Sequence, residues 1–297
     1  MTSNHMKIFV EVYKTLNMTH AAENLNMTQP AVTRAIKDIE GFYGIRLFER
    51  YNRGLHPTAK AKEVYYHANS IIASFSMMDK VLTDTDKVGI LRIGSTIALG
   101  IYLLPRLVRR INEERPNLDV RVCIENGSII ERKLVSSDLD IAFIEGPVRD
   151  RNLVAKPILD ERLVLIASPF SDVGETISLD ELFQTPLICR EKGSVTRNYL
   201  EGMFNINGKV LDPIWESESS HAIVNAVHED LGMSLLPEKL VASPLKAGWI
   251  REVKIKDLSL YRTDNIVVHK DKYISDIIKS LLDADYRNLY TNEGYDN

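Results

Sequence analysis

Residues 18–40 constrain the fold of this chain more than any other stretch. They read MTHAAENLNMTQPAVTRAIKDIE, with apolar residues at helical spacing on both sides of a single break at Asn26-Met27. Two short amphipathic helices around a tight turn form the helix-turn-helix pattern. We expect the first of these helices to cover about residues 19–25. The inward-facing residues should be Ala21, Ala22 and Leu25 before the break, and Val32, Ala35, Ile36 and Ile39 after it.

The second of these helices has a polar face suited to the major groove of double-stranded DNA. Its first residues include a candidate N-cap, Thr28, whose hydroxyl can accept a backbone N–H, and a first-turn proline. Gln pairs bidentately with adenine and Arg with guanine, whereas Thr and Lys suit phosphates. An ordinary helical hairpin with a solvated polar face is the alternative. The expected DNA contacts are Thr28, Gln29, Pro30, Thr33, Arg34 and Lys37.

A basic hairpin is expected directly after this helix, within GIRLFERYNRGLHPT (residues 44–58). Leu47 and Phe48 should fill the core, and Gly54 can adopt the positive φ of a tight tip. Such a tip beside a recognition helix would be a wing. Arg50 and Arg53 are therefore added to the expected DNA contacts, with Arg53 reaching the minor groove. The alternative is that they are solvated turn residues.

The distribution of charge supports contact with DNA at one end of the chain. Residues 1–65 hold nine Lys or Arg and six Asp or Glu, although the whole chain has a net charge of −4. A basic segment attached to an acidic remainder fits a protein that touches nucleic acid locally and does not coat it.

A long helix is predicted from Thr58, as its N-cap, to about Thr85. Its apolar residues alternate spacings of three and four, which is a heptad pattern that favours pairing with an identical helix. We expect it to form a dimer that presents two DNA-binding heads. Packing of the seam on the protein's own body is the alternative. The seam consists of Ala61, Val64, Ala68, Ile71, Phe75, Met78 and Leu82.

From residue 88 onward, the pattern alternates between strands and helices, with one long helix expected over 98–114. This predicts an α/β domain with an open, largely parallel sheet, and its length suggests two lobes. Several helix starts carry hydroxyl side chains after a strand, and such starts favour small anions. Each could equally be an ordinary helix cap. The expected domains are 1–57, 58–87 and 88–297, with lobe I about 88–161 and 265–297 and lobe II about 162–264.

The segment FVEVYKTLNMTHAAENLNMTQPAVTRAIKDIEGFYGIRLFER resembles the winged-helix head of LysR-type transcriptional regulators. LRIGSTIALGIYLLPRLVRRINEERPNLDVRV, DLDIAFIEG and HEDLGMSLLPEKLV resemble that family's effector domain, which is similar to type 2 periplasmic binding proteins. REKGSVTR is similar to a segment of relatives that sense small anions in sulfur metabolism or carbon fixation, with Val195 in place of a glycine. The resemblance implies linker-helix dimers, tetramers, and pocket positions at Ser95, Thr96, Ser128, Glu145, Ser194 and Thr196; Asn126 joins them as a strand-end residue.

Other functions find little support in the sequence. Enzyme motifs and clustered metal ligands are absent, so we expect no catalysis, cofactor or metal. Cys123 and Cys189 are too few for a disulfide framework and are expected to be buried thiols, with redox sensing as the alternative. No apolar run approaches a membrane span, and the first residues lack a signal peptide. A cytoplasmic protein is therefore expected.

Three hypotheses remain for the whole chain. In the first, it is a sequence-specific transcriptional regulator gated by a small, anionic metabolite bound between the lobes. In the second, it is a solute-binding protein for transport that uses only the lobes, and in the third an architectural DNA-binding protein whose lobes serve only assembly. The hydroxyl-rich strand ends favour the first over the third.

Overall fold

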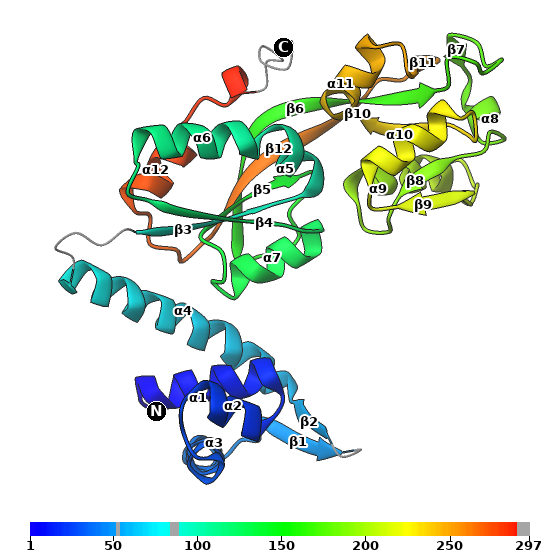
Figure 1. Cartoon of the computed structure of the whole chain (residues 1–297). Coiled ribbons are helices and arrows are strands. Elements are labelled where there is room, and N and C mark those ends of the chain that lie inside the picture. The colour runs from blue at the N-terminus through cyan, green and yellow to red at the C-terminus, as the bar shows by residue number, and fades with distance from the viewer. Residues whose placement is uncertain (52–53, 84–88, 290–297) are drawn as a thin grey trace. The chain divides into compact units, whose positions relative to one another are not determined.

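The computed structural model of the protein describes residues 1–51, 54–83 and 89–289 (Figure 1). Two compact units emerge: residues 1–88 with the short segment 135–138, and residues 89–134 with 139–297. We call the first unit the head and its long helix, and the second the effector domain. The domain boundary expected at residue 87 lies outside the described residues, so the domain limits stay predictions.

The head is built from helices α1 (Ser3–Thr15), α2 (Met18–Asn24) and α3 (Gln29–Tyr43) around a core that includes Phe9, Val12 and Leu47. The turn between α2 and α3 falls where the sequence predicts it. Asn26 adopts a left-handed conformation with φ 53°, and the Met27 N–H donates to the Ala22 carbonyl. Asn tolerates this conformation better than most residues. These features confirm the helix-turn-helix.

One detail of this turn differs from the expectation. Thr28 is the N-cap residue of α3, but its hydroxyl accepts no capping hydrogen bond. The position was therefore right and the predicted bond was wrong.

The wing consists of the antiparallel strands β1 (Phe48–Tyr51) and β2 (Gly54–Pro57). Leu47 and Phe48 are buried, as predicted. The Glu40 carboxylate of α3 accepts the backbone N–H groups of both residues, at 2.7 and 3.2 Å, and so ties the wing to the recognition helix. Gly54 does not adopt the positive φ that was expected. Arg53 lies outside the described residues.

The predicted long helix is α4 (Ala59–Thr83), and the Thr58 hydroxyl caps it by accepting the Ala61 N–H. Its expected seam divides into two parts. Ala61 and Ala68 are buried against the core of the head, which is the packing on its own body that was the alternative for the seam. The seam residues farther along expose much of their side chains: Ile71 38%, Phe75 43% and Met78 48%. The Leu82 side chain lies outside the described residues.

The described part of the effector domain contains an eight-stranded mixed sheet and a separate parallel pair, β8 (Ile188–Arg190) and β9 (Trp215–Ser217). The mixed sheet has the order β4 (Asp119–Ile124), β3 (Ile90–Ser95), β5 (Ile141–Glu145), β12 (Leu260–His269), β6 (Leu153–Ala167), β11 (Arg251–Ile255) and β7 (Thr176–Ile177), with β10 (Ser234–Pro237) also pairing with β6. The prediction of a largely parallel sheet was wrong. β3 pairs in parallel with β4 and β5, but the central pairs are antiparallel. The antiparallel pairs all involve β6 or β12, which are long strands that run through both lobes (Figure 1).

Lobe I contains β3, β4, β5 and the adjoining parts of β6 and β12. The helix expected over 98–114 is interrupted at Leu103 into α5 (Ile97–Tyr102) and α6 (Leu104–Glu114), with Pro105 in the first turn of α6. α5, α6 and α12 (Asp276–Leu282) cover one face of the sheet. α7 (Gly127–Val135) covers the other, and a short 3₁₀ turn, Arg287–Leu289, follows α12.

Lobe II surrounds the remaining parts of β6 and β12. Alternate residues of β6 point to opposite faces of the sheet, so lobe II has two cores. On one face, Leu163 and Leu165 pack with α8 (Leu179–Leu182) and α9 (Val195–Ile206). On the other face, Val164 and Ile166 pack with α10 (Ser220–His228) and α11 (Glu238–Lys246). The remaining strands are β7 (Thr176–Ile177), β8 (Ile188–Arg190), β9 (Trp215–Ser217), β10 (Ser234–Pro237) and β11 (Arg251–Ile255).

Candidate nucleic-acid interface and effector cleft

The polar residues predicted to contact DNA lie on the face of α3 opposite its buried residues. Pro30, Arg34 and Lys37 are exposed, and Gln29 and Thr33 are partly buried. The Gln29 side-chain amide donates to the Thr33 hydroxyl at 2.8 Å. This bond holds Gln29 along the helix axis and leaves the other half of its amide available to a base edge.

A groove beside the start of α3 brings the wing and the recognition helix together. Its volume is about 440 Å³, and its walls include Gln29 of α3, Arg50 of β1, and Asn17 and Thr19 at the start of α2. The Asn17 side chain caps α2 by accepting the N–H groups of Thr19 and His20. Asn17 and Thr19 were missed by the sequence reasoning, because only the folded head places the start of α2 beside the wing.

An open cleft of about 770 Å³ lies between the two lobes of the effector domain. Asn126 and Ser128 from the start of α7, and Glu145 from the end of β5, line its lobe I side. Its lobe II side is lined by Glu191, Lys192, Gly193, Val195, Asn198, Glu216 and Glu218. Most of the predicted strand ends therefore converge on this cleft, although the strands come from a mixed sheet, and Ser95 and Thr96 after β3 do not line it.

The other four predicted effector residues are buried and do not line this cleft. The Ser194 hydroxyl caps α9 by accepting the Arg197 N–H, which is the ordinary role that any such serine can have. The Ser95 hydroxyl donates to the Thr96 carbonyl. Thr96 differs, because its hydroxyl is buried and has no hydrogen-bond partner among the described residues. Thr196 is buried in the first turn of α9.

The cleft walls carry both signs of charge, but the two signs are partnered differently. Three carboxylates are neutralised by arginines: Glu145 by Arg262, Glu191 by Arg190 and Glu216 by Arg197. Two more accept backbone N–H groups, namely Glu131 and Asp150, and Glu218 is the sixth. The cations Arg132, Arg149 and Lys192 form no ion pair within the part of the chain that the structure describes.

Beneath the cleft, a charged network is buried where β5 and β12 pair. The Arg262 side chain is 0% exposed and donates to Glu145 at 2.9 Å, and its Nε lies 3.5 Å from the fully buried Asp264 carboxylate. The other Glu145 oxygen accepts the Leu99 N–H of α5, and the Tyr102 hydroxyl donates to Asp264. Glu145 thus joins the cleft wall to the strand that crosses between the lobes. Sequence reasoning missed this network, because its members are far apart along the chain.

Burial controls the protonation of this network. It raises the pKa of Asp264 to about 7, with the nearby carboxylates of Glu145 and Glu161 acting in the same direction and Arg262 opposing them. Burial likewise raises the pKa of the Glu161 carboxyl. An acid in these surroundings can be partly protonated near neutral pH.

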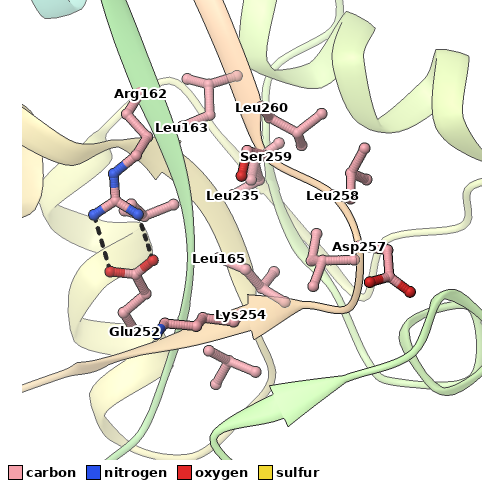
Figure 2. A pocket seen from close by; sticks show the side chains of 13 residues that line it. Arg162, Leu163, Leu165, Leu235, Glu252, Lys254, Asp257, Leu258, Ser259 and Leu260 are labelled. Atoms are coloured by element: carbon pink, nitrogen blue, oxygen red, sulfur yellow. Dashed lines mark hydrogen bonds and ion pairs between the residues drawn. The ribbon is translucent and has the colours of Figure 1, made fainter.

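A second, smaller cavity lies in lobe II (Figure 2). It shares no lining residue with the cleft. Its volume is about 320 Å³, and leucines of β6 and β10 and of the segment before β12 form much of its wall. At its edge, Arg162 pairs with Glu252 and also with Glu238. The Arg162 guanidinium is therefore already paired with two carboxylates of the protein.

The two cysteines differ in their surroundings. Cys189 is buried, and burial raises the pKa of its thiol to about 11, so the reactive thiolate is scarce at neutral pH. Cys123 is only partly buried, which differs from the expectation of a buried thiol, and Lys133 Nζ lies 2.9 Å from its sulfur.

The described residues contain neither a helix long and apolar enough to cross a membrane nor a group of side chains suited to hold a metal ion. What they do contain is a winged helix-turn-helix with an exposed polar recognition face, and a two-lobed domain with a charged cleft. Together these features define a DNA-binding transcriptional regulator with an effector-binding domain.

The chain belongs to the LysR family. Residues 3–62 match the family model "Bacterial regulatory helix-turn-helix protein, lysR family", and residues 85–284 match "LysR substrate binding domain". The chain is 28% identical over 284 residues to the uncharacterized HTH-type transcriptional regulator YeiE of Escherichia coli K12, and the match covers 95% of this chain and 96% of YeiE.

Solved structures share the fold. A full-length OxyR variant from Pseudomonas aeruginosa has a TM-score of 0.72 at 19% identity, and the match covers 95% of this chain and 94% of that one. The CcmR regulatory domain of Synechocystis PCC6803, solved in complex with 2-PG, has a TM-score of 0.61 at 24% identity, and the match covers 66% of this chain and 94% of that one.

Proposed function

We propose that this regulator binds DNA under the control of a small anionic metabolite held in the cleft between its lobes. The observation that carries the proposal is the unequal pairing of charges there. Arg132, Arg149 and Lys192 have no carboxylate partner among the described residues, whereas three of the carboxylates are neutralised by arginines. A cleft whose cations are available and whose acids are largely satisfied favours an anion.

Two further observations support this effector site. The buried Thr96 hydroxyl lacks a partner among the described residues. Thr96 also lies directly beside the cleft wall, because a Cβ built on the cleft-lining Gly127 would lie 3.6 Å from Thr96 Cγ2. In addition, the CcmR regulatory domain, which shares this fold, was solved with the small ligand 2-PG. The residues proposed to form the effector site are Asn126, Ser128 and Glu145 on the cleft wall and, buried behind it, Ser95, Thr96, Ser194 and Thr196.

On the DNA side, we propose that Gln29 and Arg34 read base edges in the major groove, and that Thr28, Thr33 and Lys37 contact the backbone with Pro30 beside them. Arg50 lies in the groove beside Gln29, which supports a contact from the wing. Arg53 is proposed from the sequence alone. Contact with DNA would place the protein in the cytoplasm.

We also propose a homodimer formed through α4, with tetramers built from two dimers. The exposed apolar side chains of Ile71, Phe75 and Met78 recur at helical spacing and support pairing of this segment with a second copy. An effector can change DNA binding only if it binds one arrangement of this oligomer more tightly than another.

The alternative functions receive less support. A solute-binding protein for transport would not use the helix-turn-helix that residues 3–62 match. A purely architectural DNA-binding protein would not need a cleft with available cations. The choice between an architectural protein and an effector-gated one depends on whether any anion binds.

Thermal unfolding of the full chain tests the proposal. Sulfate, phosphate and small organic phosphates would be added one by one, with chloride at equal ionic strength as the control. An anion at 100 times its Kd should stabilise the protein by about 2.7 kcal/mol, which raises the Tm of a domain of this size by roughly 5–10 °C. Lys192→Gln and Arg132→Gln should reduce the shift. Equal Tm values in every anion would contradict the proposal.

A further inference from the structure

Arg190 and Glu191 form an unusual pair at the edge of the effector cleft. Their side chains are 4% and 13% exposed, and the Glu191 carboxylate accepts two hydrogen bonds from the same guanidinium, at 2.8 Å from Nε and 3.1 Å from Nη2. Successive residues of a strand point to opposite faces, so neighbours seldom pair in this way. Here β8 ends at Arg190, and the chain turns at Gly193, whose φ is +92°.

The pair faces the cleft through its acidic member. Glu191 lines the cleft, whereas Arg190 lies behind it, with Nη1 3.4 Å from the Ser220 hydroxyl at the start of α10. Every described ion pair of Arg190 is therefore with the carboxylate next to it in the chain. A guanidinium that holds a carboxylate bidentately has the geometry that a small oxyanion requires.

Glu191 also connects the two lobes. Asn126 of lobe I donates from Nδ2 to Glu191 Oε1 at 3.4 Å, while its Oδ1 accepts the N–H and hydroxyl of Ser128 at the start of α7. Close by, a Cβ placed on Gly146 would lie 2.9 Å from the Val195 side chain, so the lobes are in contact there. Movement of Glu191 would break the hydrogen bond that joins Asn126 to lobe II.

We propose that Glu191 is a built-in competitor of the effector: its carboxylate occupies Arg190, which is the anchor for the anionic group of the effector. This inference rests on the proposed anionic effector and adds its anchor. An entering oxyanion takes the two guanidinium hydrogen bonds, Glu191 moves away, and the Asn126 contact between the lobes is lost. Arg190 thereby couples recognition of the anion to the arrangement of the lobes.

The test compares the full-length wild-type protein with E191Q, R190Q and E201Q, using inorganic sulfate and phosphate as probes. E191Q removes the competing charge at nearly constant shape. E201Q is the matched control, because Glu201 also pairs with a buried arginine, Arg197, but does not line the cleft. Dissociation constants would come from calorimetry, and Tm values would be measured with and without each anion.

We expect E191Q to bind at least one probe tenfold or more tightly than wild type. Its Tm without anion should be lower, because a buried guanidinium loses its partner, and the anion should restore it. R190Q should lose the binding, and E201Q should bind as wild type does. Circular dichroism of R190Q serves as the control for folding. If R190Q has the wild-type spectrum but no anion response, the loss of binding is due to the missing anchor and not to unfolding.

Three outcomes would overturn the inference. In the first, wild type and E191Q bind the anion equally well, while Lys192→Gln still reduces the anion response. This result would show that Glu191 does not compete with the anion, but it would leave the proposed effector site supported. Tighter binding by E201Q as large as that by E191Q would indicate a general effect of net charge. Absence of binding by every protein, E191Q included, would overturn both this inference and the anionic effector.

Discussion

The head and the effector domain place their charged residues in opposite ways. In the head, Arg34 and Lys37, which are proposed to contact DNA, are exposed on α3 and lie a few residues apart in the sequence. In the effector domain, Arg262, Glu145 and Asp264 are buried together, although 117 residues separate the first two along the chain. An exposed charge can be replaced at little cost in folding, whereas a buried one is held by its partners and destabilises the fold when they are lost.

The largest expected effect comes from breaking the buried network. Arg262→Ala leaves two buried carboxylates without their cation, so it should lower the free energy of unfolding by about 3–5 kcal/mol. Arg110→Ala is the control, since Arg110 pairs with Glu114 on the surface of α6. That change should cost about 0.5 kcal/mol or less. Denaturant unfolding followed by tryptophan fluorescence suits the comparison, because both tryptophans, Trp215 and Trp249, lie in the effector domain.

The pH dependence of stability sharpens the same contrast. Burial raises the pKa of Asp264 from 3.8 to about 7, so the folded protein keeps a proton that the unfolded chain loses. Stability contributed by this group is therefore lost as pH rises from about 4 to 7, by at most about 1.4 kcal/mol per pH unit. Asp264→Asn cannot titrate, so relative to wild type it should gain about 1–3 kcal/mol between pH 5 and pH 7. Parallel stability profiles for the two proteins would refute the assignment.

Changes on the exposed face of α3 should alter recognition and leave folding nearly unchanged. Gln29→Ala and Arg34→Ala should each lose about 1–3 kcal/mol of discrimination between the specific site and scrambled duplex. Lys37→Ala should weaken binding to both duplexes equally. It should also reduce the slope of the logarithm of the binding constant against the logarithm of the salt concentration by about one. Fluorescence anisotropy at several salt concentrations separates the two kinds of loss. A uniform loss for all three variants would mean that the face makes only phosphate contacts.

The smallest effect is expected at the start of α3. Since the Thr28 hydroxyl makes no capping bond, Thr28→Ala should cost less than about 0.5 kcal/mol of stability. Asn17→Ala removes a side chain that does cap α2 and should cost about 1 kcal/mol. Thermal unfolding of both variants, followed by far-UV circular dichroism, would compare them. A larger loss from Thr28→Ala would indicate a bond that the structure lacks.

These contrasts also explain which parts of the fold could be predicted from the sequence. The helix-turn-helix depends on spacing within residues 18–40 and on Asn26 at the turn, so local patterns were sufficient. The mixed sheet was missed because β6 and β12 each extend well beyond the short strands predicted at 162–168 and 265–269 from their apolar residues. The extra residues gain their strand structure by pairing with each other, and long-range pairing leaves little local signal.

The same difference applies to the candidate effector site. Asn126, Ser128 and Glu145 lie at or shortly after the ends of strands, and a rule about strand ends was enough to find them at the cleft. Arg190 and Glu191 were not singled out, although they begin the segment REKGSVTR, because their pairing depends on the turn at Gly193. Cavity and ion-pair geometry revealed them.

Base reading by α3 is tested most simply by sequence-specific DNA binding of the intact protein. A duplex selected in vitro by the full chain would be compared with its scrambled sequence at physiological salt. We expect at least about a thousandfold tighter binding to the selected duplex, and a reduced ratio in Arg34→Ala. Equal affinities for the two duplexes in wild type, with the fold intact by circular dichroism, would contradict the claim that α3 reads bases.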